Sequence, residues 1–260
     1  MSLSMSKPSV AEVRAGGQPV GIKERTNEEH WAGRLYMRDL SPYVSTVFVR
    51  LGVPPNPITY LMMAFGVLAG VVVAFGGLWS AILAAVMVQV YLLLDCSDGE
   101  VARYTGRTSV AGIYLDRIGH YVSEIALLIG LGIRAQGEFE AGGWLVLGMA
   151  AALGVALIKA ETDNVVVARA KAGLPEEVTD AAMSPRSSGL SLARRMGSAL
   201  KVHRVIQAVE LSLLVVVVAV VDAFLGDLTA TRILVAVCAF VGVLMSAAHF
   251  VSVVASRRLE

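Results

Sequence analysis

The sequence predicts an all-α integral membrane protein with six transmembrane helices, preceded by an interfacial amphipathic helix. Of the 260 residues, 56% are hydrophobic and 17% are charged, and the mean hydropathy is +0.67. Soluble domains are less apolar and carry about 25% charged residues. A membrane core of roughly 30 Å needs about 20 apolar residues per helix. Six runs approach this length: 58–79, 80–94, 112–134, 143–159, 205–225 and 231–254.

The charge balance argues against a nucleic-acid partner. Lys and Arg number 22 and Asp and Glu 21, which gives a formal net charge of +1. Such a chain has no global positive field to attract phosphates. Cys96 and Cys238 both lie in apolar stretches, where a thiol behaves as a small hydrophobic group. They therefore do not indicate a disulfide framework.

The distribution of basic residues predicts the orientation in the membrane. Apart from Arg134 and Arg232, every Lys and Arg lies before the first run, in 95–120, in 159–204 or at the end of the chain. Basic residues concentrate in cytoplasmic segments. We therefore expect both termini in the cytosol, a cytosolic loop at about 172–203, and insertion in the cell (inner) membrane.

The segment before the first run divides into two parts. Residues 1–27 are polar and lack the apolar core of a signal peptide, so we expect a disordered cytosolic tail. Residues 28–53 carry apolar side chains at helical spacing between arginines, which predicts an amphipathic helix at the lipid headgroups. Ser41 and Pro42 are expected at a helix start. Residues 54–260 then form the six-helix transmembrane domain. An amphipathic helix on a soluble surface is the alternative for 28–53, but a membrane span follows within about ten residues.

Acidic residues gather where the second run passes into the third. Carboxylates at membrane depth are costly and mark a functional site by default. Asp95 and Asp98 share one face of a helix, and Asp116 and His120 share one face of the next. Because the connection between these helices is short, they must be antiparallel neighbours, and their polar faces can meet.

The residues around the connection support this arrangement. Gly106 is expected to end the first helix and Ser109 to cap the second. Gly99 and Gly112 have no Cβ, so a ligand or the facing helix can come close to the backbone. Arg103 can bind a phosphate through two parallel hydrogen bonds.

Converging carboxylates repel one another unless a cation lies between them. Oxygen ligands suit Mg²⁺, Mn²⁺ or Ca²⁺, and Mg²⁺ is usually shared between carboxylates and substrate phosphates. The sequence therefore predicts a hard divalent metal site at the cytosolic end of the helices.

The stretch from Asp95 to His120 resembles the signature of the CDP-alcohol phosphotransferase family, Asp-x2-Asp-Gly-x2-Ala-Arg-x8-Gly-x3-Asp-x3-Asp. Seven of the eight fixed positions match at every spacing: Asp95, Asp98, Gly99, Ala102, Arg103, Gly112 and Asp116. The stretch that contains Asn56 and Thr59 is similar to the Pro-Asn-x-x-Thr element before the family's first transmembrane helix. The family's six-helix membrane fold agrees with the spans predicted from hydropathy.

The resemblance implies a metal-dependent membrane transferase with one or two Mg²⁺ or Mn²⁺ ions. A hydroxyl of an acceptor would attack the phosphorus bonded to the donor alcohol of a CDP-alcohol and release CMP. The donor would be CDP-diacylglycerol and the acceptor a polar alcohol, in phospholipid biosynthesis, with a soluble CDP-polyol donor as the alternative. The metal and diphosphate would be held by Asp95, Asp98 and Asp116, and the CDP pocket lined by Gly99, Ala102, Arg103, Gly112, Asn56 and Thr59. Homodimers are common in this family.

The eighth position departs from the family pattern, because His120 stands where the family has its last aspartate. That aspartate is thought to help bind metal and to deprotonate the acceptor. An imidazole, with an ordinary pKa of about 6.5, can serve as the base, and as a ligand it would favour Mn²⁺ or Zn²⁺. We therefore expect His120 and Asp116 to be catalytic and His120 to be a candidate ligand. A lost or altered activity, or a His120 merely bonded to a neighbour such as Glu124, are the alternatives.

Polar residues near the fourth, fifth and sixth runs are further candidates. In family members that accept a phosphorylated alcohol, basic residues in the regions of Lys159 and Lys201 bind its phosphate; the alternative is that they anchor helix ends. His249 is expected to be a bonded interior residue. A small ion- or proton-coupled transporter is the rival function, but transport does not require the glycines and Arg103 at these spacings.

Overall fold

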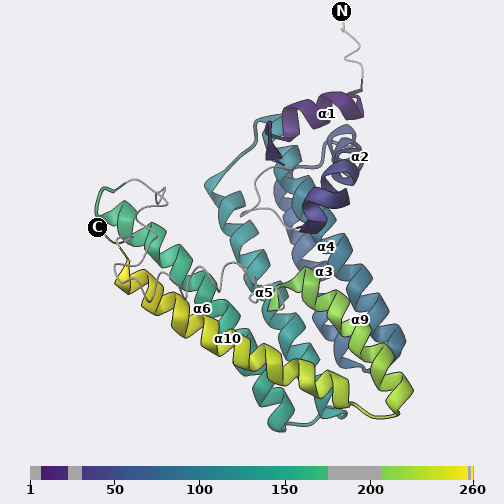
Figure 1. Ribbon diagram of the computed structural model, residues 1–260. Helices are drawn as coiled ribbons and strands as arrows, with labels where there is room; N and C mark the ends of the chain where they lie inside the picture. The colour runs from purple at the N-terminus through teal and green to yellow at the C-terminus, as the bar shows by residue number, and fades with distance from the viewer. Residues whose placement is uncertain (1–6, 23–30, 175–205, 257–258, 260) are drawn as a thin grey trace, which may run out of the picture. The chain divides into compact units, whose positions relative to one another are not determined.

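The computed structural model describes residues 7–22, 31–174, 206–256 and 259, and the predicted cytosolic loop at about 172–203 lies almost entirely outside them. Six helices in the described part are long and apolar enough to cross a membrane, which confirms the predicted fold class (Figure 1). They are α3 (Pro55–Ala74), α4 (Gly77–Thr105), α5 (Val110–Gln136), α6 (Gly143–Lys171), α9 (Ala208–Leu225) and α10 (Thr229–Ala255).

The clearest difference between the helix boundaries and the predicted spans is at the end of the first span. The sequence pattern predicts a first span that reaches residue 79, whereas α3 ends at Ala74 and Trp79 belongs to α4. The break falls at Gly76 and Gly77, which both have positive φ (72° and 74°), a conformation that side chains with a Cβ disfavour. Elsewhere α4 and α6 continue as helix through the polar extensions of their apolar runs, to Thr105 and Lys171.

Internal contacts divide the chain into two compact units. The first consists of Met1–Ala69 and Leu83–Ser123, and the second of Gly70–Ile82 and Glu124–Glu260. The first unit therefore contains the amino-terminal segment and the parts of α3, α4 and α5 that carry the acidic cluster. The second contains α6, α9, α10 and the remaining parts of α3, α4 and α5.

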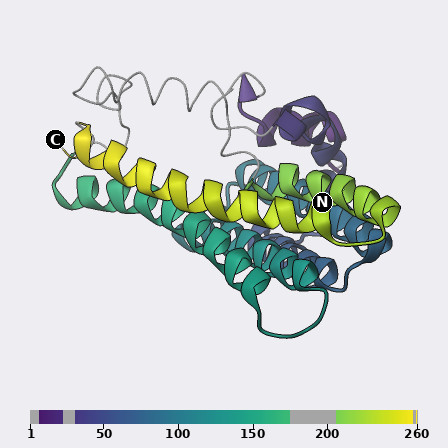
Figure 2. The ribbon, with the colours of Figure 1, turned by 60° about the horizontal axis from the view of Figure 1, so that its bottom comes forward.

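Glycines allow the helices of the second unit to pack closely. Figure 2 shows α6 and α10 running side by side. A Cβ added at Gly154 of α6 would collide with the backbone of Gly242 on α10. A Cβ added at Gly132 of α5 would lie 3.0 Å from the Cα of Gly148 on α6. Small residues at such contacts let helix backbones approach, which favours association of transmembrane helices.

Part of the segment 1–27 is helical, contrary to the expectation that this segment is disordered. Val10–Gly17 form helix α1. The Ser9 hydroxyl accepts a hydrogen bond from the N–H of Glu12, and the Glu12 carboxylate accepts one from the N–H of Ser9 (3.2 Å and 2.6 Å). This reciprocal pair is a capping box, whose signature, Ser followed three residues later by Glu, is present in the sequence. The N–H and the hydroxyl of Ser9 both donate to the Glu12 carboxylate (2.6 Å and 2.8 Å), and these two bonds lower the pKa of that carboxyl.

The predicted helix start at Ser41 and Pro42 is wrong. A π-helical turn, η2 (Gly33–Met37), leads into α2 (Arg38–Arg50), so both residues lie inside α2. Pro42 has no N–H to donate to the carbonyl of Arg38, four residues earlier. The side-chain amide of Gln18, just after α1, donates to that carbonyl instead (2.7 Å). A contact from outside the helix therefore replaces the bond that proline removes.

The apolar face of α2 stays at the surface of the first unit. Leu40, Tyr43 and Val47 are each about half exposed. This exposure is compatible with the predicted location at the lipid headgroups, which stays a prediction.

The contact between Gly154 and Gly242 yields a stability prediction. Gly154→Ala should lower the free energy of unfolding by about 1–3 kcal/mol, because the added methyl group forces α6 and α10 apart. Thermal unfolding in detergent micelles measures the effect. The matched control is Gly143→Ala at the start of α6, where the added Cβ meets nothing within 4 Å. Equal unfolding midpoints for the two variants would contradict the packing described here.

Candidate active site

The connection between α4 and α5 has the predicted caps. Gly106 has φ +64° and ends α4, and the N–H of Arg107 bonds back to the carbonyl of Ala102 (2.9 Å). This is the Schellman pattern of a helix that ends in a left-handed glycine. At the start of α5, the Ser109 hydroxyl accepts a hydrogen bond from the N–H of Gly112 (3.0 Å). The predicted stop and start are therefore both confirmed.

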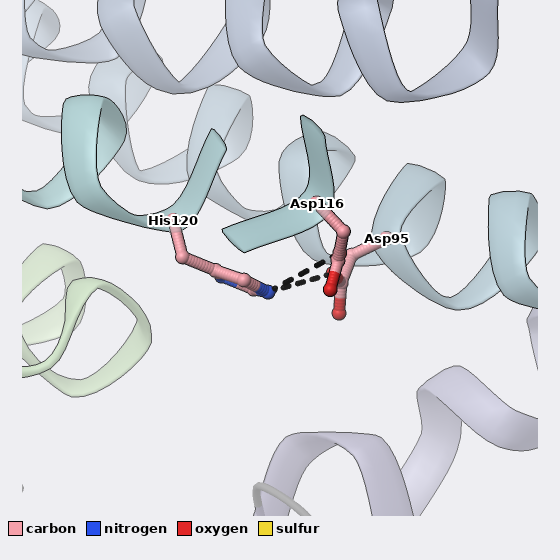
Figure 3. A group of neighbouring side chains, drawn as sticks. All are labelled: Asp95, Asp116 and His120. Carbon is pink, nitrogen blue, oxygen red and sulfur yellow. Dashed lines mark ion pairs between the residues drawn. The ribbon is translucent and has the colours of Figure 1, made fainter. Parts of the chain in front are cut away.

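The connection brings acidic residues of both helices together with His120. One ligand atom from each of Asp95, Asp116 and His120 lies within 4.8 Å of the others. In Figure 3 the imidazole of His120 points at the two carboxylates. Its Nε2 lies 3.1 Å from Oδ1 of Asp95 and 3.6 Å from Oδ1 of Asp116. The two polar helix faces thus meet at Asp95, Asp116 and His120, whereas Asp98, the third predicted metal-binding acid, is not part of this group of three.

Tyr91 fixes the orientation of the imidazole. The Tyr91 hydroxyl is hydrogen-bonded to Nδ1 of His120, and the tyrosine ring is buried. Because Nδ1 is engaged, Nε2 is the nitrogen that faces the carboxylates. A metal ligand and a general base both need the lone pair of that nitrogen, so His120 can fill only one of these roles at a time. Sequence reasoning missed Tyr91, although it lies one helical turn before Asp95.

Asp98 is oriented by a residue from α3. The Thr59 hydroxyl donates to Oδ2 of Asp98 (2.6 Å), and both side chains are buried. The predicted binding residue Thr59 therefore also holds one oxygen of a predicted metal ligand in place. Asp98 also lies on the wall of the cavity described next.

A cavity of about 200 Å³ lies beside these residues. All six residues predicted to line the donor pocket are on its wall: Asn56, Thr59, Gly99, Ala102, Arg103 and Gly112. Asp98 and Asp116 line the same cavity. It thus offers carboxylates for a metal ion and a guanidinium for an anion, the combination that a metal-bound phosphate requires.

Gly99 and Gly112, the two signature glycines on the wall of the cavity, lie close to polar side chains. A Cβ at Gly99 would lie 3.1 Å from Nη1 of Arg103, so the guanidinium itself lies over the glycine. The sequence predicted room there for a ligand or a facing helix. A Cβ at Gly112 would lie 3.2 Å from Oγ of Ser109, the capping hydroxyl, and 3.4 Å from Oδ1 of Asn56. The glycines therefore permit the positions of polar side chains in the wall.

The donor set fits a divalent metal ion. Carboxylate oxygens from Asp95 and Asp116 suit Mg²⁺ and Mn²⁺, and Asp98 lies on the same helix face as Asp95. An imidazole as third ligand would favour Mn²⁺ or Zn²⁺. The bond from Tyr91 to the other ring nitrogen is the kind of support that a ligating histidine usually has.

Other predicted residues form ion pairs in the second unit. Lys159 lies 3.2 Å from a carboxylate oxygen of Glu124, the residue considered above as an alternative partner of His120. Nδ1 of His249 lies 2.7 Å from a carboxylate oxygen of Glu161, which confirms that His249 is a bonded residue. Lys201 lies outside the described residues.

Comparison with known proteins gives one family and two relatives. A model of the CDP-alcohol phosphatidyltransferase family matches residues 53–244. The chain is 30% identical over 132 residues to the phosphatidylinositol phosphate synthase of Streptomyces avermitilis, and this match covers 50% of each protein. It is 28% identical over 125 residues to the bifunctional IPC transferase and DIPP synthase of Aquifex aeolicus, covering 48% of this chain and 26% of that protein. The chain thus spans about half the length of the first relative and less of the second.

The cluster predicts where a metal ion binds. Asp95→Asn and Asp116→Asn should each weaken Mn²⁺ binding by at least about tenfold, since even the partners of metal ligands change affinity by that much. Electron paramagnetic resonance of Mn²⁺ titrated into the purified protein measures the affinity. Glu138→Gln, in the exposed connection between α5 and α6, is the control and should bind Mn²⁺ as the unmodified protein does. Unchanged affinity in both aspartate variants would show that the ion, if bound, lies elsewhere.

Proposed function

The chain belongs to the CDP-alcohol phosphatidyltransferase family, and we propose that it is a membrane transferase that moves a substituted phosphate from a CDP-alcohol to a hydroxyl of a polar acceptor. CMP is the second product, and the reaction belongs to phospholipid biosynthesis. The observation that carries this proposal is the meeting of Asp95, Asp116 and His120 within 4.8 Å. Arg103 on the wall of the cavity that Asp116 also lines adds the anion-binding group.

The residues of the cavity divide the binding of the donor between them. A divalent ion held by Asp95, Asp98 and Asp116 would neutralise charge on the pyrophosphate and on the departing CMP. The Arg103 guanidinium binds phosphate oxygens and orients the donor. Thr59 keeps Asp98 in position through its hydrogen bond.

We assign His120 the role of general base. Nε2 takes the proton of the acceptor hydroxyl while the acceptor oxygen bonds to the phosphorus that carries the donor alcohol, and the bond from that phosphorus to CMP breaks. The carboxylates of Asp95 and Asp116 lie 3.1 Å and 3.6 Å from Nε2 and can accept a hydrogen bond from the protonated ring that results. Tyr91 keeps the ring in the orientation that presents Nε2.

The donor in this proposal is CDP-diacylglycerol. The S. avermitilis relative is named for a phosphatidyl product, phosphatidylinositol phosphate, which favours a lipid donor. The name of the A. aeolicus relative does not, so a soluble CDP-polyol is the alternative donor. We further propose that the site faces the cytosol with both termini on that side, because basic residues flank it, and that the protein forms homodimers, as family members commonly do.

A turnover assay tests the proposed reaction. The purified protein in liposomes should release CMP from CDP-diacylglycerol when Mg²⁺ or Mn²⁺ and a polar alcohol such as inositol or inositol phosphate are supplied. Asp98→Asn should abolish this release, because the variant loses a charged group beside the metal and the pyrophosphate. The control variant Glu138→Gln should release CMP as the unmodified protein does.

Each arm of the assay has a distinct meaning. If CMP is released from a CDP-polyol but not from CDP-diacylglycerol, the donor is the CDP-polyol and the proposed reaction type stands. No release from either donor, across several acceptors and metals, would contradict the proposal. Ion uptake that persists after Asp95→Asn would then favour the transporter.

The role of His120 has its own test. His120→Ala should lower kcat by about 10²–10⁴-fold, the usual contribution of a general base, and should leave Mn²⁺ affinity nearly unchanged. His120→Asp, which restores the family residue, should recover part of the rate. A loss of Mn²⁺ affinity parallel to the loss of kcat would instead place His120 among the metal ligands and contradict its assignment as the base.

A further inference from the structure

A buried carboxylate ties the amino-terminal segment to α4. Glu100, at a position that the family signature leaves variable, is fully buried. Its oxygens accept hydrogen bonds from Ser41 (2.5 Å), Ser45 (2.6 Å) and the side-chain amide of Gln18 (2.8 Å), and Arg38 lies 3.9 Å away. A buried charge is costly without such partners. Every one of these partners precedes residue 53, where the match to the family begins.

The end of α1 lies directly on α4 next to this carboxylate. Gly17 is buried, and a Cβ added to it would be 3.0 Å from the carbonyl oxygen of Glu100 and 3.2 Å from its Cα. A Cβ at Gly16 would be 2.9 Å from the ring of Tyr104. Because the atoms facing Gly17 belong to helix backbone, they cannot move aside as a flexible side chain can. Only glycine fits this contact without displacing α1.

The same contact reaches into the donor cavity through Arg103. Nε of Arg103 donates to the carbonyl oxygen of Gly17 (2.5 Å). Its two Nη atoms lie over Gly99, on the wall of the cavity. One edge of the guanidinium is thus held by the end of α1, and the Nη groups are presented to an anion. A guanidinium fixed in this way loses less freedom when it binds a phosphate than a freely rotating one.

We propose that α1 is a positioning element of the donor site. Glu100 holds Gln18 and α2, Gly17 seats the end of α1 on α4, and the carbonyl of Gly17 orients Arg103 toward the pyrophosphate of the donor. The identity of the ligand as a pyrophosphate rests on the proposed function. The positioning itself rests on the contacts of Gly17, Glu100 and Arg103.

The experiment measures CDP binding to the full chain in detergent by titration calorimetry with Mn²⁺ present. Gly17→Ala should weaken CDP binding by about tenfold, because a displaced guanidinium forms weaker charged hydrogen bonds with the phosphates of CDP. Ala15→Ser adds one non-hydrogen atom to the exposed side of α1 and is the matched control, with an unchanged Kd. Gln18→Glu has nearly the same size as the original residue but repels Glu100, and should weaken binding in the same direction.

A double-mutant cycle separates positioning from a general loss of structure. If α1 acts through Arg103, Gly17→Ala should weaken binding no further once Arg103→Ala is present. Losses that multiply in the double variant would overturn the inference, as would a Kd for Gly17→Ala equal to that of the unmodified protein. Unfolding midpoints identify a variant that has lost its fold, and Gln18→Glu then decides. No CDP binding by the unmodified protein would overturn the proposed function as well, whereas normal binding with no effect of Gly17→Ala overturns this inference alone.

Discussion

The repulsion between carboxylates held close together in a membrane helix pair is the constraint on which the site depends. Asp95 and Asp116 come from different helices, yet their oxygens and Nε2 of His120 lie within 4.8 Å. This arrangement costs free energy unless positive charge or a shared proton compensates it. A divalent cation or a protonated imidazole supplies that charge, and a phosphate substrate can share the cation. The acids, which would be costly in an ordinary membrane helix, are therefore the binding groups that we propose.

Two different parts of the chain position the two kinds of charge. The carboxylates are placed by the helices of the family match: the turn at Gly106 sets α4 against α5, and Thr59 of α3 orients Asp98. The guanidinium of Arg103 is placed by the amino-terminal segment, through the carbonyl of Gly17. The family signature therefore describes the acids together with the arginine, but it does not describe what holds the arginine.

The sequence was sufficient for those features that depend on local chemistry. Apolar runs predicted the six long helices, and glycine and serine at the right places predicted the cap at each side of the connection, Gly106 and Ser109. The spacing of three and four residues predicted which acids share a face. These features follow from backbone geometry and hydrophobicity, which a short window of sequence already contains.

Features that depend on distant contacts were not predictable. Pro42 stands inside α2 because Gln18, far along the chain, replaces the bond that proline removes. Trp79 was assigned to the first span although it belongs to α4, because the apolar sequence continues without a charged residue across the break at Gly76 and Gly77. Tyr91 and Glu100 are ordinary in their helices, and their roles appear only with their partners, His120 and the amino-terminal segment. Helix α1 was missed for a different reason, because the sequence does contain the local signal of its capping box, Ser9 followed three residues later by Glu12.

The central claim, that Asp95 and Asp116 gather a cation, is tested most directly by locating the ion. Crystals of the protein grown with Mn²⁺ and measured at an X-ray wavelength near the manganese absorption edge would reveal the ion by its anomalous scattering. We expect a peak within about 2.0–2.3 Å of carboxylate oxygens of both aspartates, the range of divalent metal-to-oxygen bonds. The account would be contradicted if the anomalous map showed no peak there and the two carboxylates were turned away from each other.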